Sequence, residues 1–410
     1  MKVKRYNSIY RRHIDPLKVI GAILMTLAFL GLGILIASLI IGAVNNGKNQ
    51  SSDTSSNTSE NLIINTSSTV STPDEDESTV VRDGAIRSAF LPLDTVNNPA
   101  KLDAFISDAK QTGITDVIIT VKDEGGIIYF DSDYEEAKYI KNESESLPDL
   151  KNAVEKLHQN GLNAVAQMHC FMDRIGTRIK NAGVLYSENH SVVWLDDEKQ
   201  NGGKSWLNPY SPQARDYLKY LAGEIADIGF DVIMLDSVRF PDGYQIYAYY
   251  GSNLSSREDC LKSFVSEMKH HLAEKDTEMW LYASAVSYVD PNWEKFTKNI
   301  FTLGADVVMF NACPRNFPQK LAFDMTVIDT PIKNPKQTVT ALIKLAQQKC
   351  AGTDVRLVPV LQAYTDSTIP FEYNQDYTSE TVKLQFEALA ETNLTDYAVY
   401  SPDGSLELLK

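Results

Sequence analysis

From residue 86 to the C-terminus, the sequence alternates between short β-rich apolar runs and longer amphipathic stretches. Apolar runs bounded by turn residues predict buried strands, and apolar residues spaced three or four apart predict helices. The predicted strands are 86–93, 115–122, 163–170, 231–236, 280–286, 306–311, 356–362 and 397–401. The predicted helices lie near 99–112, 147–160, 211–228, 257–275, 291–303, 335–350 and 378–393. The pattern therefore predicts eight β/α units.

Glycine and proline mark the ends of these helices. A glycine directly follows four of them, where a left-handed C-cap favours that residue: Gly113, Gly161, Gly229 and Gly304. Proline stands near the start of three, where a missing N–H is tolerated: Pro148, Pro212 and Pro291.

The strand composition indicates a parallel sheet. Val232–Leu235 and Val307–Phe310 are uninterrupted apolar runs, as expected for strands buried on both faces by helices. Eight such units in one domain, 83–410, predict an α/β fold of the (β/α)8 TIM-barrel type. An open, doubly wound sheet is the alternative, and no G-x-G-x-x-G or P-loop motif follows any strand to support it.

A second long-range feature precedes this domain. The 26 residues 19–44 carry no charge, and about 20 apolar residues suffice for a membrane-spanning helix. The flanking positive charges lie on the N-terminal side, which predicts cytoplasmic residues 1–18 and an extracytoplasmic C-terminal domain. A cleaved signal peptide is the alternative, but the apolar run is longer than the usual ~7–15 residues and no clear A-x-A site follows it. We expect an uncleaved signal anchor.

Residues 45–82 are rich in Ser, Thr, Asn and acidic side chains. The segment includes the acidic run Asp74–Glu77 and has too few apolar residues for a core. We interpret it as a disordered linker between the membrane and the barrel.

Charge restricts the partners. The chain has a formal charge of -15, and residues 1–18 contain six basic and one acidic side chain, so the remainder carries -20. Nucleic acid and anionic lipid would be repelled by such a domain. Neutral or cationic ligands fit better.

The cysteines are far apart and form no C-x-x-C pair. They are Cys170, Cys260, Cys313 and Cys350. Their spacing does not match a zinc site, and an isolated cysteine is usually a small buried apolar residue. We interpret them as core residues, and we expect neither a metal nor another cofactor.

In a TIM barrel the active site is built from residues at the C-terminal ends of the strands. The polar residues predicted there include Lys122, Asp123, His169, Asp236, Arg239, Asp290, Asn311, Gln362, Tyr364 and Asp366.

Asp236 is the best-supported catalytic residue among these candidates. It follows four apolar residues at the end of a predicted central strand. A buried carboxylate is unfavourable unless it is paired, and carboxylates at such positions stabilise or attack the sugar cation in glycoside hydrolysis. The structural alternative is an ion pair between Asp236 and Arg239 that only orders the loop.

Three segments together resemble a known family. They are Gly229–Pro241, Val117–Gly126 and Val358–Gln362, and the resemblance extends over residues 85–402. The chain is similar to a glycoside hydrolase-like (β/α)8-barrel family of bacterial extracytoplasmic proteins, long described only as a domain of unknown function. The resemblance implies a TIM barrel related to the α-amylase-like clans, with Asp236 as nucleophile. This chain departs from the family at Ser237, where a tyrosine is usual, and in Ser284–Ser287, where the family has an acidic residue.

The missing acid leaves the proton donor open. The candidates, in order of preference, are Asp366, Asp290 and Asp123. The residues predicted to position substrate are Lys122, His169, Arg239, Asn311, Gln362, Tyr364 and Trp206. A structural role for His169 is an equally supported alternative. The long segment 171–208 is predicted to cover the substrate, because long loops in compact domains tend to be functional.

These observations predict a membrane-anchored, extracytoplasmic glycoside hydrolase that acts on a polysaccharide by a two-carboxylate mechanism. The main alternative is a catalytically inactive barrel that binds glycans. A metal-dependent hydrolase is disfavoured because the sequence has no H-x-H pair. A protein-binding scaffold would show an apolar surface patch in place of a polar cleft.

Overall fold

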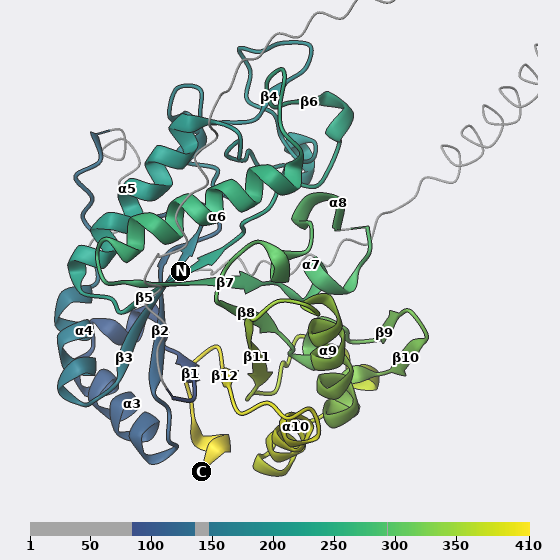
Figure 1. The fold of residues 1–410 in the computed structure, drawn as a ribbon. Helices are drawn as coiled ribbons and strands as arrows, with labels where there is room; N and C mark the ends of the chain where they lie inside the picture. Colours follow the sequence, from purple (N-terminus) through teal and green to yellow (C-terminus); the bar gives the residue numbers. More distant parts are fainter. Residues whose placement is uncertain (1–83, 136–146, 293) are drawn as a thin grey trace, which may run out of the picture. The chain divides into compact units, whose positions relative to one another are not determined.

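The computed structural model describes residues 84–135, 147–292 and 294–410 (Figure 1). The predicted cytoplasmic segment 1–18, the predicted transmembrane helix 19–44 and the predicted linker 45–82 lie outside the described residues. In the part of the chain that is described, no helix is both long and apolar enough to cross a membrane.

Eight parallel strands close into a barrel in the order β1-β12-β11-β8-β7-β5-β3-β2. Closure is complete because β1 pairs with both β2 and β12. The TIM barrel predicted from the sequence is confirmed, and the open sheet is excluded. The strands are β1 (Arg87–Phe90), β2 (Asp116–Lys122), β3 (Asn163–His169), β5 (Val232–Asp236), β7 (Glu278–Ala283), β8 (Val307–Asn311), β11 (Arg356–Gln362) and β12 (Tyr397–Tyr400).

Helices surround the barrel (Figure 1). They are α2 (Leu93–Val96), α3 (Pro99–Gln111), α4 (Leu150–Gln159), α5 (Pro212–Ile228), α6 (Arg257–Ala273), α7 (Ala285–Val289), α8 (Glu294–Thr297), α9 (Pro335–Lys349) and α10 (Ser379–Glu391). Short 3-10 turns occupy Gly176–Arg178, Lys199–Asn201, Gln245–Tyr247, Ile300–Thr302, Pro314–Asn316, Pro331–Lys333, Phe371–Tyr373 and Glu407–Leu409. The ends of α5 follow the predicted signals, since Ser211 caps its first turn and Gly229 ends it at φ 110°.

One predicted helix, 291–303, is wrong. The region contains the short helix α8 and the 3-10 turn Ile300–Thr302 instead. Asp290 accepts a hydrogen bond from the backbone N–H of Asn292, and Lys298 adopts a left-handed φ of 52°. A left-handed residue interrupts the hydrogen-bond ladder of a helix, so a continuous helix does not form.

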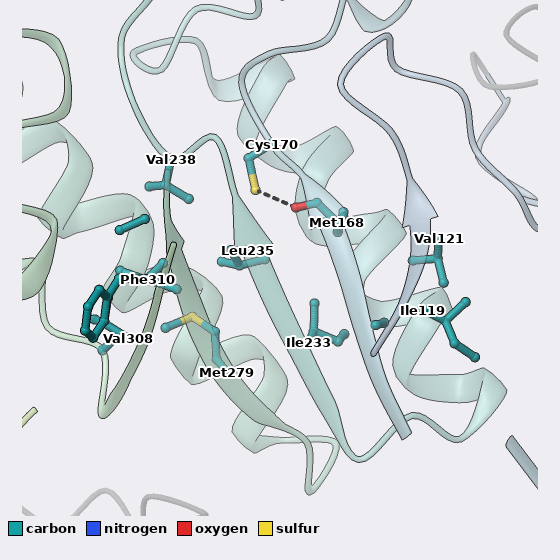
Figure 2. Packing of buried hydrophobic residues seen from close by; sticks show 14 of the residues in the cluster. Ile119, Val121, Met168, Cys170, Ile233, Leu235, Val238, Met279, Val308 and Phe310 are labelled. Atoms are coloured by element: carbon teal, nitrogen blue, oxygen red, sulfur yellow. Dashed lines mark hydrogen bonds between the residues drawn. The ribbon is translucent and has the colours of Figure 1, made fainter. Parts of the chain in front are cut away.

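Two apolar layers stabilise the barrel. The inner layer fills its interior and includes Ile118 and Met234. The outer layer lies between strands and helices and includes Ile119, Leu235 and Phe310 (Figure 2). The two layers alternate along each strand because successive side chains point to opposite faces.

The cysteines belong to these layers as predicted. Cys170, Cys260 and Cys313 are buried, and Cys350 is partly buried. Cys170 lies in the outer layer, where its thiol contacts the carbonyl of Met168 (Figure 2).

Two long loops carry an additional small sheet. The loop after β3 contains β4 (Leu185–Tyr186), and the loop after β5 contains β6 (Ala248–Tyr249), which pairs antiparallel with β4. Because both loops leave the C-terminal ends of barrel strands, this insertion stands at the mouth end of the barrel (Figure 1). A separate hairpin of β9 (Lys320–Phe323) and β10 (Thr326–Asp329) follows β8.

Candidate active site

The C-terminal ends of the strands carry a ring of side chains that face the barrel mouth. Alternate side chains of a strand share a face, and Ile118, Val165 and Met234 fill the interior. The residues two positions further along therefore face the mouth. The ring consists of Phe90, Thr120, Gln167, Asp236, Tyr282, Asn311, Gln362 and Tyr400.

Asp236 is held inside this ring and is 7% exposed. Its Oδ2 accepts a hydrogen bond from Gln167 Nε2 at 2.9 Å, and its Oδ1 accepts one from Ser237 Oγ at 3.2 Å. His169 Nε2 lies 3.5 Å from Oδ2. These polar neighbours compensate for the water that the carboxylate loses on burial.

Ser237 has an unusual backbone conformation. Its φ is 57°, in the left-handed region that residues other than glycine rarely adopt and that occurs often at functional sites. The turn places Ser237 Oγ 3.0 Å from His169 Nδ1 while it also bonds to Asp236. Asp236, Ser237 and His169 therefore form one connected polar network.

Tyr282 faces the same space from β7. Its hydroxyl accepts a hydrogen bond from Asn311 Nδ2 at 3.0 Å. Burial and then the negative charge of Asp236 raise the pKa of Tyr282 well above its ordinary value. The phenol stays neutral and remains a hydrogen-bond donor beside the carboxylate.

Aromatic rings form one wall of the mouth. Tyr400 packs edge-to-face against both Phe90 and Tyr364, with ring centroids 5.4 Å and 5.8 Å apart. Phe90 and Tyr400 line a cavity of about 240 Å³ together with Thr120, Asp123 and Tyr129.

This cavity is connected to Asp236 by hydrogen bonds. Thr120 Oγ1, in its wall, donates to Gln167 Oε1 at 2.8 Å, and Gln167 donates onward to Asp236. A ligand bound in the cavity would thus be connected to the Asp236 carboxylate through two side chains, those of Thr120 and Gln167.

The preferred proton donor, Asp366, has a pKa below its ordinary value. Burial alone would raise its pKa, but the hydroxyl and N–H of Thr368 and the charge of Arg315 outweigh burial and lower the pKa of Asp366. The guanidinium of Arg315 lies 2.7 Å from Asp366 Oδ2. A general acid is favoured by the opposite shift, and the acid role of Asp366 stays a prediction.

The two other acid candidates organise their own loops. Asp123 accepts hydrogen bonds from the N–H groups of Gly125 and Ile127 and from the Tyr129 hydroxyl. Asp290 accepts from Asn292. The acid roles of Asp123 and Asp290 stay predictions.

Lys122 does not face the mouth as predicted. A β-bulge after Thr120 shifts the register, so that Lys122 pairs with Met168 of the outer layer. Its ammonium forms a 2.9 Å ion pair with Asp173, and both side chains are 0% exposed. It also donates to the carbonyl of His169 at 2.6 Å. In this structure Lys122 therefore supports the backbone of His169, and its role in positioning substrate stays a prediction.

Arg239 and Trp206 stack on each other beneath the insertion. The Arg239 guanidinium lies 4.5 Å from the centroid of the Trp206 ring. Trp206 is 1% exposed, and its indole N–H donates to Asp196 at 2.9 Å. Arg239 pairs with Asp242 at 3.5 Å. Trp206 is therefore buried against Arg239 and Asp196, and its substrate-binding role stays a prediction.

Gln362 is also a structural link. It is buried, accepts a hydrogen bond from the N–H of Arg315 and donates to the carbonyl of Tyr364. It thereby joins the loops after β8 and β11. Asn311 and Tyr364, which are partly buried at the mouth, keep their predicted positions.

Three mouth residues were missed by the sequence analysis: Gln167, Ser237 and Tyr282. Gln167 and Tyr282 lie inside strands at alternate positions from interior apolar residues, so period-two counting back from the strand ends would have found them. The left-handed turn at Ser237 carries no sequence signal, since serine has no preference for it.

A metal site would need several ligating side chains close together. In residues 84–135, 147–292 and 294–410, no group of three or more His, Cys, Asp or Glu side chains could hold a metal ion.

Comparison with known proteins covers nearly all of this domain. Residues 88–405 match the model of a family described as "Putative glycosyl hydrolase domain". The glycoside hydrolase domain of PgaB (BpsB) from Bordetella bronchiseptica is similar in structure, with a TM-score of 0.55 at 14% identity over 78% of this chain and 95% of that chain. A hypothetical protein from Ruminiclostridium thermocellum matches with a TM-score of 0.39 at 21% identity over 44% of this chain and 91% of that one. No curated protein matches the sequence. The Bordetella likeness supports the barrel fold.

Proposed function

The chain belongs to the family described as "Putative glycosyl hydrolase domain", and from that premise we propose that it hydrolyses glycosidic bonds of a polysaccharide at the barrel mouth. The observation that carries the proposal is Asp236, a buried carboxylate at the end of β5 with Gln167, Ser237 and His169 around it. A fixed negative charge in such a site stabilises the oxocarbenium-like transition state of glycoside hydrolysis.

We assign the proton transfer to His169 in place of the predicted Asp366. Its Nε2 is 3.5 Å from Asp236, whereas hydrogen bonds from Thr368 and the charge of Arg315 outweigh burial and lower the pKa of Asp366. The imidazolium gives its proton to the glycosidic oxygen as the carbon–oxygen bond breaks. Water then adds to the anomeric carbon and returns a proton to the imidazole.

A catalytically inactive, glycan-binding barrel is the second candidate. The observation that favours it is that Asp366, Asp290 and Asp123 all accept hydrogen bonds that stabilise their loops. In that case Asp236 binds sugar hydroxyls and no bond is broken.

We also propose that the chain is anchored in the cell membrane by residues 19–44, with the barrel outside the cytoplasm. The uncharged length of this segment and the basic residues before it support that orientation. The substrate would then be a cell-wall, capsular or captured glycan.

The test compares full-length protein, purified in mild detergent, with its Asp236→Asn variant on a panel of wall, capsular, α-glucan and amino-sugar polymers. Products are scored by mass spectrometry. We expect cleavage by the wild type and a loss of about 10³-fold or more in the variant, the usual effect of removing one essential transition-state group. Asp216→Asn, on the exposed face of α5, is the matched control and should cleave normally.

Glycan binding without cleavage, unchanged by Asp236→Asn, would establish the inactive barrel. Cleavage that survives in the variant would remove Asp236 from the mechanism.

A further inference from the structure

The insertion at the barrel mouth contains a groove of about 600 Å³. One side comes from the loop after β3, with Tyr186, Glu188 and Trp194, and the other from the loop after β5, with Tyr244 and Tyr247. Sites for small ligands typically measure about 300–1,000 Å³. The groove is large enough for part of a glycan chain.

Paired strands, a backbone hydrogen bond and a small buried cluster support the groove. β4 and β6 pair beneath it, and the N–H of Ser187 donates to the carbonyl of Tyr247 at 2.8 Å, which joins the two loops directly. Val184, Trp194 and Trp206 form a small buried cluster of their own under the same loops. A site on a packed scaffold loses little entropy when it binds.

Two tyrosines present their rings at the surface of the groove. Tyr244 is 54% exposed and Tyr247 is 45% exposed, with ring centroids 6.5 Å apart. Exposed, paired aromatic rings are unusual on a surface without a ligand, and they offer apolar faces to the C–H groups of sugars.

The charge of the groove is acidic. Glu188, Asp197 and Glu198 line it, and none of the described lining residues is basic. Carboxylates beside aromatic rings favour a cation, through ion pairing and through attraction to the ring faces. The same charges repel uronic acids and phosphate-containing glycans.

A buried polar group points independently to a ligand. Trp194 is one of the residues that line the groove, its side chain is buried, and its indole N–H has no hydrogen-bond partner within the described part of the chain. An unpaired buried donor costs about 1–3 kcal/mol, so such donors are rare unless a ligand or water pairs with them.

We propose that this groove binds a cationic stretch of the polysaccharide, in which amino sugars carry free amines, and guides it to the barrel mouth. Binding in the groove does not depend on the proposed hydrolase function; only the delivery of the bound glycan to the barrel mouth rests on it. The loops that form the groove start directly after His169 and Asp236. The stack of Arg239 on Trp206, whose indole bonds to Asp196, connects the Asp236 loop to the groove wall.

The test measures binding by calorimetry in the full-length Asp236→Asn protein, so that no turnover is needed. The probes are a glucosamine hexamer, its fully N-acetylated form and an oligogalacturonate. We expect the glucosamine hexamer to bind most tightly, and Tyr244→Ala/Tyr247→Ala to weaken it by about tenfold or more, as for anchoring aromatic residues elsewhere. Tyr220→Ala, an exposed tyrosine on α5, is the matched control and should bind as the parent does.

The charge requirement is tested with Glu188→Gln/Glu198→Gln. This variant should bind the glucosamine hexamer more weakly and lose its sensitivity to about 1 M salt, where the Debye length is about 3 Å. Equal affinity for the N-acetylated or galacturonate probe, unchanged binding in the tyrosine variant, or no binding of any probe would overturn the groove assignment. Groove binding without cleavage in the wild type would sustain this inference and reject the hydrolase.

Discussion

Asp236 is surrounded by groups that act on it from three directions. Gln167 and Ser237 donate hydrogen bonds to its two carboxylate oxygens. Burial, and then the negative charge of Asp236, raise the pKa of the Tyr282 phenol and keep that phenol neutral. The network therefore holds the Asp236 carboxyl in a fixed position at the barrel mouth, where positive charge develops on the sugar in the proposed reaction.

The proton-donor role of His169 is tested by changing the leaving group. His169→Ala should cleave the natural glycan about 10²–10⁴-fold more slowly, the usual contribution of general acid catalysis. An aryl glycoside with a good leaving group needs no protonation, so the variant should lose much less activity on it. Initial rates on both substrates measure the difference. Equal losses on both would assign His169 a positioning role.

The ionisation of Asp366 predicts a pH dependence of stability. Its folded-state pKa is lowered, so its charge stabilises the fold above the unfolded pKa of about 3.9. This contribution is lost as the pH falls through the folded pKa. Wild type should therefore be more stable than Asp366→Asn at pH 7, and the gap should close below about pH 4. Thermal midpoints across this pH range measure it, and a constant gap would contradict the assignment.

At the scale of elements, strand positions were predictable because buried parallel strands are continuous apolar runs. The direction in which Lys122 points was not, because it depends on the bulge after Thr120 and on a partner, Asp173, some fifty residues away. The helix predicted at 291–303 failed for a similar reason. A left-handed residue such as Lys298 leaves no mark in the apolar periodicity.

The buried ion pair Lys122–Asp173 also positions two loops relative to each other. Gly126, at φ 88°, approaches so closely that a Cβ there would lie 1.9 Å from Asp173 Oδ1. Gly176 donates its N–H to the same oxygen. The pair thus fixes the loops after β2 and β3, and through the carbonyl of His169 it reaches the active site.

Removing one partner of this pair should be strongly destabilising. Lys122→Met leaves the Asp173 carboxylate buried without its cation, which should lower the free energy of unfolding by about 3–5 kcal/mol. Lys122→Met/Asp173→Asn should recover much of that loss. Chemical denaturation of the single and double variants measures the coupling.

The exposed pair Lys156–Asp103, at 2.8 Å but with side chains 27% and 63% exposed, is the matched control. Its removal should change the free energy of unfolding by less than about 1 kcal/mol, as for exposed ion pairs in general. A similar change at both pairs would mean that burial does not control the stability of the first.

At the scale of the whole molecule, closure joins segments that are far apart in the sequence. Asp396, just before β12, accepts hydrogen bonds from the Arg356 guanidinium and from the N–H of Ile86. These contacts lie at the N-terminal ends of the strands, opposite the mouth. Because these contacts are far from the mouth, the loops at the mouth can vary without disturbing barrel closure. For the same reason, counting β/α units predicted the fold but not the contacts between side chains at the mouth.

The proposed anchor predicts where the whole protein is found in the cell. Wild type should sediment with membranes, and deletion of residues 1–44 should release the barrel to the soluble fraction, because the deleted segment contains the only predicted spanning run. Protease added to intact cells with a permeable outer layer should digest the barrel domain, since positive charges before the helix orient it outward. Wild type in the soluble fraction would reject the anchor. A membrane-bound barrel protected from protease until lysis would instead reject the orientation, and would place the acidic groove and the Asp236 site on the cytoplasmic side, away from any envelope polysaccharide.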